Sequence, residues 1–344
     1  MMSGRFLNLP RRQSGLTLIE LLVALGLGLF VVLVAATALL MGQQGYRSVD
    51  ATTQLRDRER FATDLLARVA IQAGYQDLSA SNVSVRSTAA LLGNDPEPDV
   101  YGWNNAVYNR PDDLLLSTST KIVTGNRPGS CAVTDTSCRN GSDVLVIRYQ
   151  GINSPTNPID PDNTMINCMG FGEAGLTNGD LNDRAGSIFH VIRSPNGEPS
   201  LACSYYKFNS PAGWVGPFPM IEGVESFQVL YGTDGVAPSL PPSSTVVQDT
   251  VAERWLRADQ LTVAGNAAFT RENWRRVRAI RIGLVMRGGL GSAQQAIARS
   301  FLPLGSLYYS NSDDPGSNLA VAADGRLRLE STFTVHLRND MTLR

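Results

Sequence analysis

The stretch SGLTLIELLVAL, residues 14–25, decides the fold of this chain. It leads into residues 21–46, which contain no Asp, Glu, Lys or Arg and consist mainly of Leu, Val, Ala and Gly. A helix needs about 20 apolar residues to cross a bilayer, so residues 16–46 predict a transmembrane helix. The arginines Arg5, Arg11 and Arg12 precede it. By the positive-inside rule, the N-terminus lies in the cytoplasm and the later chain lies across the membrane.

Two features distinguish this segment from a cleaved secretory signal peptide. The apolar region of a signal peptide is usually about 7–15 residues long and ends at a cleavage site of small residues. Here the apolar run is longer, and no proline interrupts the chain between Pro10 and Pro96. The sequence therefore favours a retained membrane anchor.

Glu20 places a carboxylate near the start of this apolar helix. A charged side chain at the bilayer centre costs about 2.5–3.5 kcal/mol on insertion scales, and such residues usually have a partner. Glu20 is only about 6–8 Å along a helix that starts at residue 16, so it lies near the cytoplasmic face. The pattern allows two interpretations, a snorkelling glutamate or a carboxylate paired with a cation.

Gly15, an apolar residue and then Thr17-Leu18-Ile19-Glu20 resemble the class III signal of type IV prepilins and type II secretion pseudopilins. The resemblance implies that residues 1–15 are a leader and that a prepilin peptidase cuts between Gly15 and Leu16. It also implies that Leu16 is N-methylated and that Glu20 neutralises the N-terminal amine of a neighbouring subunit during filament assembly. Leu16 departs from the family, in which the first mature residue is usually Phe.

The composition indicates a loop-rich domain outside the cytoplasm. The chain has 344 residues, 18% charged residues, 32 glycines and 18 prolines. Its formal net charge is -1, and removal of the three leader arginines takes the mature chain to -4. The chain therefore has no net positive charge that would predict nucleic-acid binding. Residues 79–344 are expected to form one β-rich globular domain in the periplasm or outside the cell.

Residues 47–78 are expected to continue the helix as an amphipathic, soluble half. Apolar residues recur at helical spacing and charged residues fill the other sides, which predicts a face that packs on the globular domain. The helix should run from residue 16 to about residue 71 and stop at Ala73-Gly74-Tyr75. The predicted apolar stripe consists of Leu55, Ala62, Leu66, Val69 and Ala73.

Apolar runs and period-two alternation predict several strands in the globular domain. The clearest is residues 326–338, where Phe333 and Val335 face one way and His336 faces the other, as in a half-buried antiparallel strand. Residues 249–261, which include Trp255, are predicted as a short helix. The other predicted strands are residues 114–116, 121–124, 143–149, 187–193, 201–208, 224–231 and 277–287.

The four cysteines are Cys131, Cys138, Cys168 and Cys203. An even number outside the cytoplasm predicts two disulfides, and four cysteines allow three pairings. We favour Cys131 with Cys138 and Cys168 with Cys203, because each pair lies in one local region. Metal ligation is disfavoured, because CxxC-like spacing is absent and no histidine lies nearby.

Residues 223–232, 277–287 and 337–339 resemble PilW-type minor pilins. The resemblance implies an α+β, type IV pilin-like fold, with a long N-terminal helix packed on an antiparallel β-sheet domain. It implies a minor pilin that takes part in initiating or assembling a type IV pilus, in a tip or priming complex. The alternatives are a J-type minor pseudopilin of type II secretion and a tip adhesin or DNA-uptake receptor.

The same resemblance implies partners and a location. The expected partners are other minor pilins, the major pilin, the prepilin peptidase, the inner-membrane assembly platform and a large tip adhesin. The expected location is a single span of the inner membrane with the C-terminal domain in the periplasm, and later the pilus tip or cell surface. No GxSxG, HExxH or GxxxxGK[ST] motif occurs, so neither an enzyme nor a cofactor is expected.

Two binding hypotheses remain from the residues alone. Asp180, Asn182 and Asp183, or residues 160–163, offer hard oxygen ligands for Ca²⁺. Neither segment has EF-hand spacing, so a plain turn is favoured. A basic run around Trp274 is a candidate for binding a DNA backbone, although the solvent face of a strand is the favoured interpretation. The run consists of Arg271, Arg275, Arg276, Arg278 and Arg281.

Overall fold

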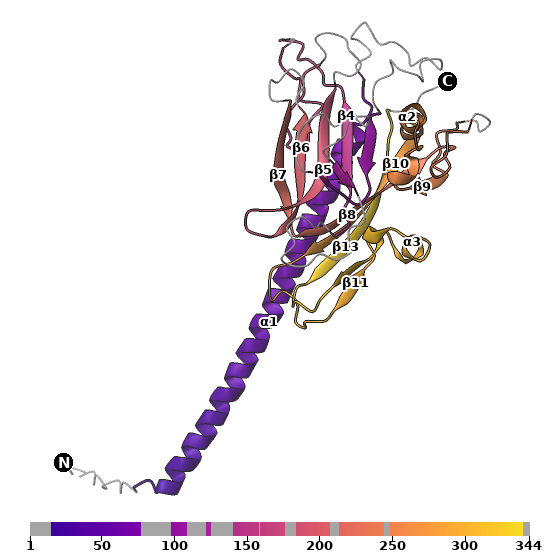
Figure 1. Cartoon of the computed structure of the whole chain (residues 1–344). Helices are drawn as coiled ribbons and strands as arrows, with labels where there is room; N and C mark the ends of the chain where they lie inside the picture. Colours follow the sequence, from indigo (N-terminus) through magenta and orange to yellow (C-terminus); the bar gives the residue numbers. More distant parts are fainter. Residues whose placement is uncertain are drawn as a thin grey trace, which may run out of the picture. The chain divides into compact units, whose positions relative to one another are not determined.

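The chain forms two compact units, Met1–Asp50 and Ala51–Arg344, and helix α1 (Leu18–Ile71) contributes residues to both. Figure 1 shows the computed structural model of the whole chain. The structure describes residues 15–76, 98–108, 122–124, 140–157, 159–175, 184–206, 213–243 and 248–339.

In the N-terminal unit, α1 is apolar on every side between Leu21 and Met41. Its most apolar 18-residue window has a mean hydropathy of 2.8, and none of that window is buried. Within the described part of the chain, α1 is the helix that is long and apolar enough to cross a membrane, by length and composition. A helix that is apolar all round needs lipid or other apolar helices around it.

In the globular unit, the second half of α1 is amphipathic and buries one stripe. The stripe predicted from the sequence is confirmed, because its members are at most 2% exposed. The helix ends at Ile71. Gly74 then takes φ +71° and donates its N–H to the Arg148 carbonyl at 3.0 Å, which stops the helix against the sheet. The buried side chains are Leu55, Ala62, Leu66, Val69, Ala70 and Ala73.

Antiparallel strands form two main sheets, of five strands in the order β1-β4-β5-β6-β7 and four strands in the order β13-β10-β8-β9. Strands β11 and β12, and strands β2 and β3, form two small ladders. The five-stranded sheet contains β1 (Val100–Trp103), β4 (Val144–Tyr149), β5 (Ala185–Arg193), β6 (Pro199–Tyr206) and β7 (Trp214–Glu222). The four-stranded sheet contains β8 (Val224–Thr233), β9 (Arg254–Leu256), β10 (Val277–Arg287) and β13 (Arg328–His336).

The remaining elements are short and lie between these strands in the sequence. The small strands are β2 (Ala106–Tyr108), β3 (Ile122–Thr124), β11 (Arg299–Phe301) and β12 (Leu319–Val321). The helices are η1 (Asp259–Leu261), α2 (Ala267–Arg275), α3 (Ser306–Ser310) and η2 (Pro315–Ser317).

Gly223 carries the chain from the five-stranded sheet into the four-stranded sheet. It has φ +90°, and a Cβ there would lie 2.4 Å from the Arg287 carbonyl oxygen, so the crossing requires glycine.

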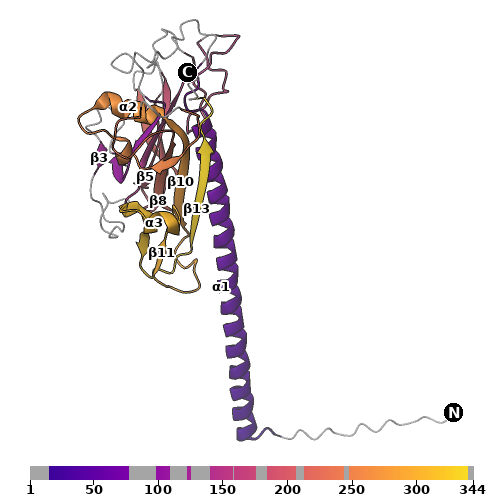
Figure 2. The same cartoon turned by 90° about the vertical axis from the view of Figure 1, so that its right-hand side faces the viewer.

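Helix α1 forms hydrogen bonds with both sheets. Arg58 donates to the Glu222 carbonyl at 3.3 Å, and the Ser331 hydroxyl donates to Glu59 at 2.7 Å. Figure 2 shows β13 running beside the second half of α1.

The core lies between α1 and the sheets and extends to α2. Strand β8 is buried along its whole length, because elements cover both of its faces. Tyr231 of β8 meets Trp274 of α2 edge to face, with ring centroids 4.6 Å apart. Along β13, Val335 is buried while Thr334 and His336 are exposed, which confirms the predicted half-buried strand. The predicted α+β architecture is therefore confirmed.

Predictions for the weaker segments had mixed outcomes. The helix predicted over residues 249–261 is wrong, because Thr250 has φ +67° and Trp255 and Leu256 pair with β8 in strand β9. Helix α2 lies further along and was not predicted. Strand β7 was missed because it contains Pro217 and Pro219, which are tolerated where a strand has one neighbour. Residues 122–124 form β3, and the predicted strand at 114–116 lies outside the described residues.

Truncation of the buried stripe should destabilise the globular unit. Leu66 is 0% exposed on α1, so Leu66→Ala should lower the free energy of unfolding by about 2–5 kcal/mol. Phe61 on the same helix is 51% exposed, and Phe61→Ala should change it by less than about 0.5 kcal/mol. Denaturant unfolding of the full chain in detergent, followed by tryptophan fluorescence, measures both. Equal losses in the two variants would contradict the packing described.

Candidate functional site

Thr17 and Glu20 form a capping box at the start of α1. The Glu20 carboxylate accepts from the Thr17 backbone N–H at 3.2 Å and from the Thr17 hydroxyl at 3.1 Å. In return, the Glu20 N–H donates to the Thr17 hydroxyl oxygen at 3.3 Å. These reciprocal bonds satisfy donors at the helix start that otherwise lack partners. The spacing Thr-x-x-Glu is the sequence signal of this capping box.

Glu20 has no ion-pair partner among the described residues, where its hydrogen bonds go to Thr17. The carboxylate is therefore oriented by uncharged donors and is exposed at the helix surface. Leu18 beside it is 76% exposed. A negative charge held among exposed apolar side chains is suited to pairing with a cation on a second molecule.

Gly15 and Leu16 precede the first turn of α1. Leu16 is 76% exposed, and a Cβ added at Gly15 would meet no atom within 4 Å. The peptide bond between them therefore lies in an open, non-helical segment. Such a segment fits the extended conformation that a peptidase needs at its cleavage site. Cleavage itself stays a prediction.

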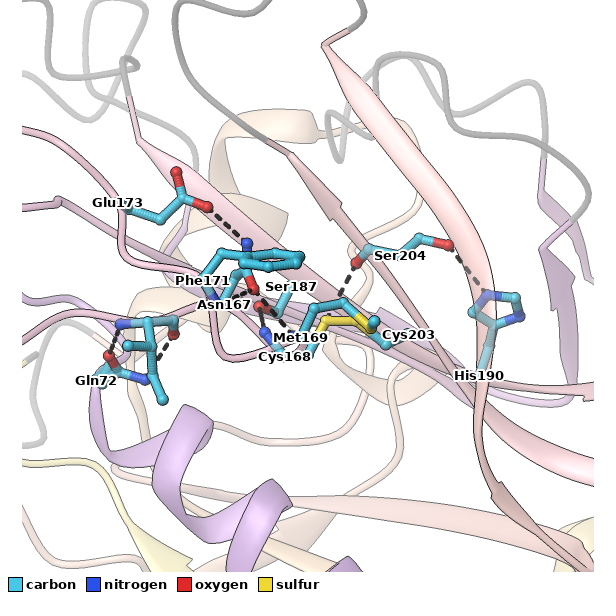
Figure 3. Close-up of a disulfide and its surroundings, with 11 residues drawn as sticks. Gln72, Asn167, Cys168, Met169, Phe171, Glu173, Ser187, His190, Cys203 and Ser204 are labelled. Atoms are coloured by element: carbon cyan, nitrogen blue, oxygen red, sulfur yellow. Dashed lines mark hydrogen bonds between the residues drawn. A yellow bond between two sulfur atoms is a disulfide. The ribbon is translucent and has the colours of Figure 1, made fainter. Parts of the chain in front are cut away.

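A disulfide joins Cys168 to Cys203 of β6, with their Cα atoms 6.0 Å apart. This is the pairing favoured from the sequence, and Figure 3 shows it with its surroundings. The backbone N–H of Cys168 also donates to the Ser187 hydroxyl of β5 at 3.0 Å. The loop before β5 is thus fixed to two strands. Cys131 and Cys138 lie outside the described residues.

Gln72, just after α1, fixes the same loop to the helix end. Its amide nitrogen donates to the Ile166 carbonyl at 3.0 Å, and the Ile166 N–H donates to its amide oxygen at 2.7 Å (Figure 3). Asn167 then accepts from the N–H groups of Met169 and Phe171 at 2.9 and 3.1 Å. These bonds present Phe171, 57% exposed, on the surface beside Tyr205 of β6, with ring centroids 6.0 Å apart.

Three arginines and three carboxylates form a network where the two sheets meet. Arg287 at the end of β10 contacts Glu198 and Glu225, each at 2.8 Å. Arg326, two residues before β13, and Arg328, the first residue of β13, complete it. The contacts are Arg326–Glu198 at 3.0 Å, Arg328–Glu225 at 2.6 Å and Arg328–Asp324 at 2.7 Å. Burial raises the pKa of Glu198, but hydrogen bonds from Arg287 and Arg326 outweigh burial and lower the pKa below its ordinary value.

Asp143 is a buried carboxylate that joins the β1–β2 turn to β8. It accepts from the backbone N–H groups of Asn105 at 2.8 Å and Val229 at 2.7 Å. Burial, together with repulsion from Asp314, raises the pKa of Asp143 well above its ordinary value. Burial likewise raises the pKa of Asp314, which accepts from the Gly316 N–H. These contacts give both acids structural roles between elements.

Of the basic run predicted on a solvent face, three arginines are buried, whereas Arg271 and Arg281 are partly exposed, so the solvent-face interpretation is wrong for the three buried members. Arg275, Arg276 and Arg278 are at most 7% exposed. Arg276 pairs with Glu272 one helical turn earlier at 3.3 Å, and Arg278 pairs with Asp234 at the end of β8 at 3.6 Å. The guanidinium of the last member, Arg281, lies 4.1 Å from the Trp255 ring centroid. Three of these cations therefore already have partners within the chain, a carboxylate for Arg276 and for Arg278 and an aromatic ring for Arg281, which argues against DNA binding through them.

The calcium candidates divide into two groups. Asp180, Asn182 and Asp183 lie outside the described residues. In the other segment, Asp162 accepts from the Thr164 N–H at 2.9 Å, and Asp160 accepts from the Asn157 amide at 2.8 Å. These are local turn contacts, in agreement with the favoured interpretation.

Another acidic cluster cannot be recognised from sequence spacing, because its members come from two segments. Asp234, Asp249 and Glu253 place one carboxylate oxygen each within 4.8 Å of one another. Asp234 accepts from the Thr250 N–H at 2.9 Å, and Glu253 accepts from the Gly235 N–H at 2.8 Å. The carboxylates therefore fix the loop before β9 to the end of β8.

The arginine network should make stability depend on pH. The pKa of Glu198 is lowered in the folded state, so its contribution is present above the unfolded pKa of about 4.3 and is lost as the pH falls through the folded value. The difference in unfolding free energy between wild type and Glu198→Gln should therefore be full at about pH 6–7 and narrow below about pH 4. Denaturant titrations at several pH values measure it. Asp64→Asn, at an exposed carboxylate, is the control. A pH-independent difference would contradict the network's role.

Two protein-family models match the chain. The model of type IV pilus-assembly protein W matches residues 188–339, from β5 to the end of the described chain. The model of the prokaryotic N-terminal methylation motif matches residues 10–36, which include Gly15, Leu16 and Glu20. No curated protein sequence matches the chain.

Among the solved structures that match is one that aligns over most of the chain. It is the type IV-like pilin TTHA1219 from Thermus thermophilus, with 13% sequence identity and a TM-score of 0.35. The match covers 83% of this chain and 96% of that chain.

The two family matches lie where the sequence resemblance predicts them. The N-terminal match covers Gly15, Leu16 and Glu20 around the start of α1, and the C-terminal match covers the strands that carry the arginine network. The chain combines a long apolar N-terminal helix with a β-rich globular unit, as a membrane-anchored pilin does. Together the two matches support a PilW-type minor pilin of type IV pilus assembly.

Proposed function

We propose that this chain is a minor pilin that helps to initiate a type IV pilus, in a priming or tip complex with other minor pilins. The observation that carries the proposal is Glu20, a carboxylate without an ion-pair partner among the described residues, in a helix with exposed apolar side chains on every side. Cleavage after Gly15 would create an amine at Leu16 at the same depth of the membrane. That amine on a neighbouring subunit is the cation that Glu20 lacks.

The apolar half of α1 supports assembly rather than simple anchoring. An anchor requires only lipid around it, whereas a bundle of such helices must also neutralise its buried charges. The capping box holds the Glu20 carboxylate at the helix start, where a neighbour's amine would arrive. The first subunits of a filament would form by repeating this contact, and their globular units would dock side by side.

The pilus is favoured over the type II secretion pseudopilus by the match of residues 188–339 to a pilus-assembly family. The proposed partners are other minor pilins, the major pilin, the prepilin peptidase, the assembly platform and a large tip adhesin. The protein would first span the inner membrane, with the globular unit in the periplasm, and later reach the pilus tip. This role requires neither a catalytic centre nor a cofactor.

Two substitutions separate helix capping from charge neutralisation. Glu20→Gln keeps an oxygen that accepts from Thr17 but removes the charge, whereas Glu20→Val removes both. If pairing with an amine is required, both variants should enter the membrane normally and be recovered in sheared pili at least about tenfold less than wild type. A tenfold lower recovery corresponds to a loss of about 1.4 kcal/mol in the free energy of incorporation. Quantitative immunoblots of membranes and sheared pili measure it.

The pattern of the two variants decides between the roles. Wild-type recovery of Glu20→Gln together with loss of Glu20→Val would assign Glu20 to helix capping and contradict charge pairing. Thr17→Val is the matched control, because it removes the hydroxyl of the capping box but leaves the Glu20 charge in place. Under the proposal, Thr17→Val stays close to wild type.

A further inference from the structure

A pocket of about 630 Å³ opens in the globular unit between the β1–β2 turn and α2. Small-molecule sites typically have volumes of about 300–1,000 Å³. Two regions distant in the sequence, the end of β1 and the stretch from η1 to α2, form the walls. The walls comprise residues 102–104 at the end of β1, residues 258–263 around η1, and residues 265–271 at the start of α2.

The walls of the pocket are held firmly. Trp103 packs edge to face against Tyr101 within β1, with ring centroids 5.6 Å apart. Asp259 receives two hydrogen bonds from Arg257, at 2.9 and 3.0 Å, and this arginine is held in turn by Asp313 at 2.5 Å. Such a bidentate pair fixes the plane of the Asp259 carboxylate.

The opposite wall is fixed by the cap of α2. Asn266 accepts from the Phe269 N–H at 3.0 Å through its side-chain oxygen. The Thr270 hydroxyl accepts from the Val263 N–H at 2.9 Å, which closes the loop between η1 and α2. A site whose supports are already bonded loses little entropy when a ligand binds.

Several polar groups of the pocket retain capacity for hydrogen bonds. Within the described residues, the Trp103 indole N–H, the Thr262 hydroxyl and the Asn266 amide N–H₂ form no hydrogen bond. The Asp259 side chain is 52% exposed, and each of its oxygens accepts one bond from Arg257, which leaves lone pairs available. The pocket thus combines a flat aromatic ring with separate donors and acceptors.

We infer that this pocket binds a neutral saccharide. A pyranose presents an apolar C–H face, which packs on an aromatic ring such as Trp103, and an edge of hydroxyls that both donate and accept. Asp259 accepts from two hydroxyls, while Asn266 and Thr262 donate to ring or hydroxyl oxygens. The lining holds one carboxylate, Asp259, and one guanidinium, Arg271, which suits a ligand without net charge, and a single lining carboxylate is too few for a divalent cation site.

This inference is independent of the proposed assembly role, because the pocket and Glu20 share no residue. Trp103→Ala should therefore leave the recovery of the subunit in sheared pili unchanged. Loss of saccharide binding and loss of assembly can then be measured separately.

The test uses the full chain in lipid nanodiscs, which avoids detergents with sugar head groups. An array of neutral and acidic mono- to tetrasaccharides is probed with wild type and variants, and each bound neutral glycan is titrated by calorimetry. Trp103→Ala and Asp259→Asn should each weaken binding by at least about tenfold. Trp255→Ala, at a tryptophan that stacks on Arg281 away from the pocket, is the control and should bind as wild type.

Several results would overturn the inference. They are the absence of any bound neutral glycan, binding restricted to acidic glycans, and equal binding by wild type and Trp103→Ala. The melting temperature of each variant is measured in parallel. If Trp103→Ala does not fold, Thr262→Val tests the same wall without removing a large side chain, and unchanged binding of that variant and of Asp259→Asn would also overturn the inference.

Discussion

One buried stripe on α1 holds the globular unit together. Its side chains, centred on Leu66, are excluded from solvent, and polar contacts beside the stripe bind Glu222 of one sheet and Ser331 of the other. The apolar half of the same helix is exposed on all sides. One continuous element therefore serves two environments, and its change in pattern near residue 50 separates the part suited to lipid from the part suited to a protein core.

The placement of charge follows the same division. In the globular unit, the arginine network and the pairs around Arg276 and Arg278 neutralise charges within the chain. In the apolar half of α1, Glu20 contacts Thr17, which is neutral. A charge that is paired inside the globular unit contributes to folding. A charge without an ion-pair partner in an apolar helix is suited to pairing with a cation on another molecule. This contrast is the physical basis of the role in filament assembly that we propose for Glu20.

The sequence predicted the features that depend on local periodicity. The stripe of α1, the stop at Gly74 and the alternation of β13 follow from spacing alone, and they are confirmed. Features that depend on distant partners were missed. Pro217 and Pro219 made the edge strand β7 unrecognisable from its sequence. The arginines near Trp274 gave no indication of the carboxylates with which they form ion pairs. The saccharide pocket could not be predicted, because its walls come from segments more than 150 residues apart.

The account depends on a mature chain that starts at Leu16 and enters a filament. Mass spectrometry of this subunit isolated from sheared pili tests that claim most directly. The account predicts an N-terminal peptide that begins with N-methylated Leu16, immediately before the capping box of α1. An N-terminus that retains the leader, an unmethylated or displaced first residue, or the absence of the subunit from pili would contradict it.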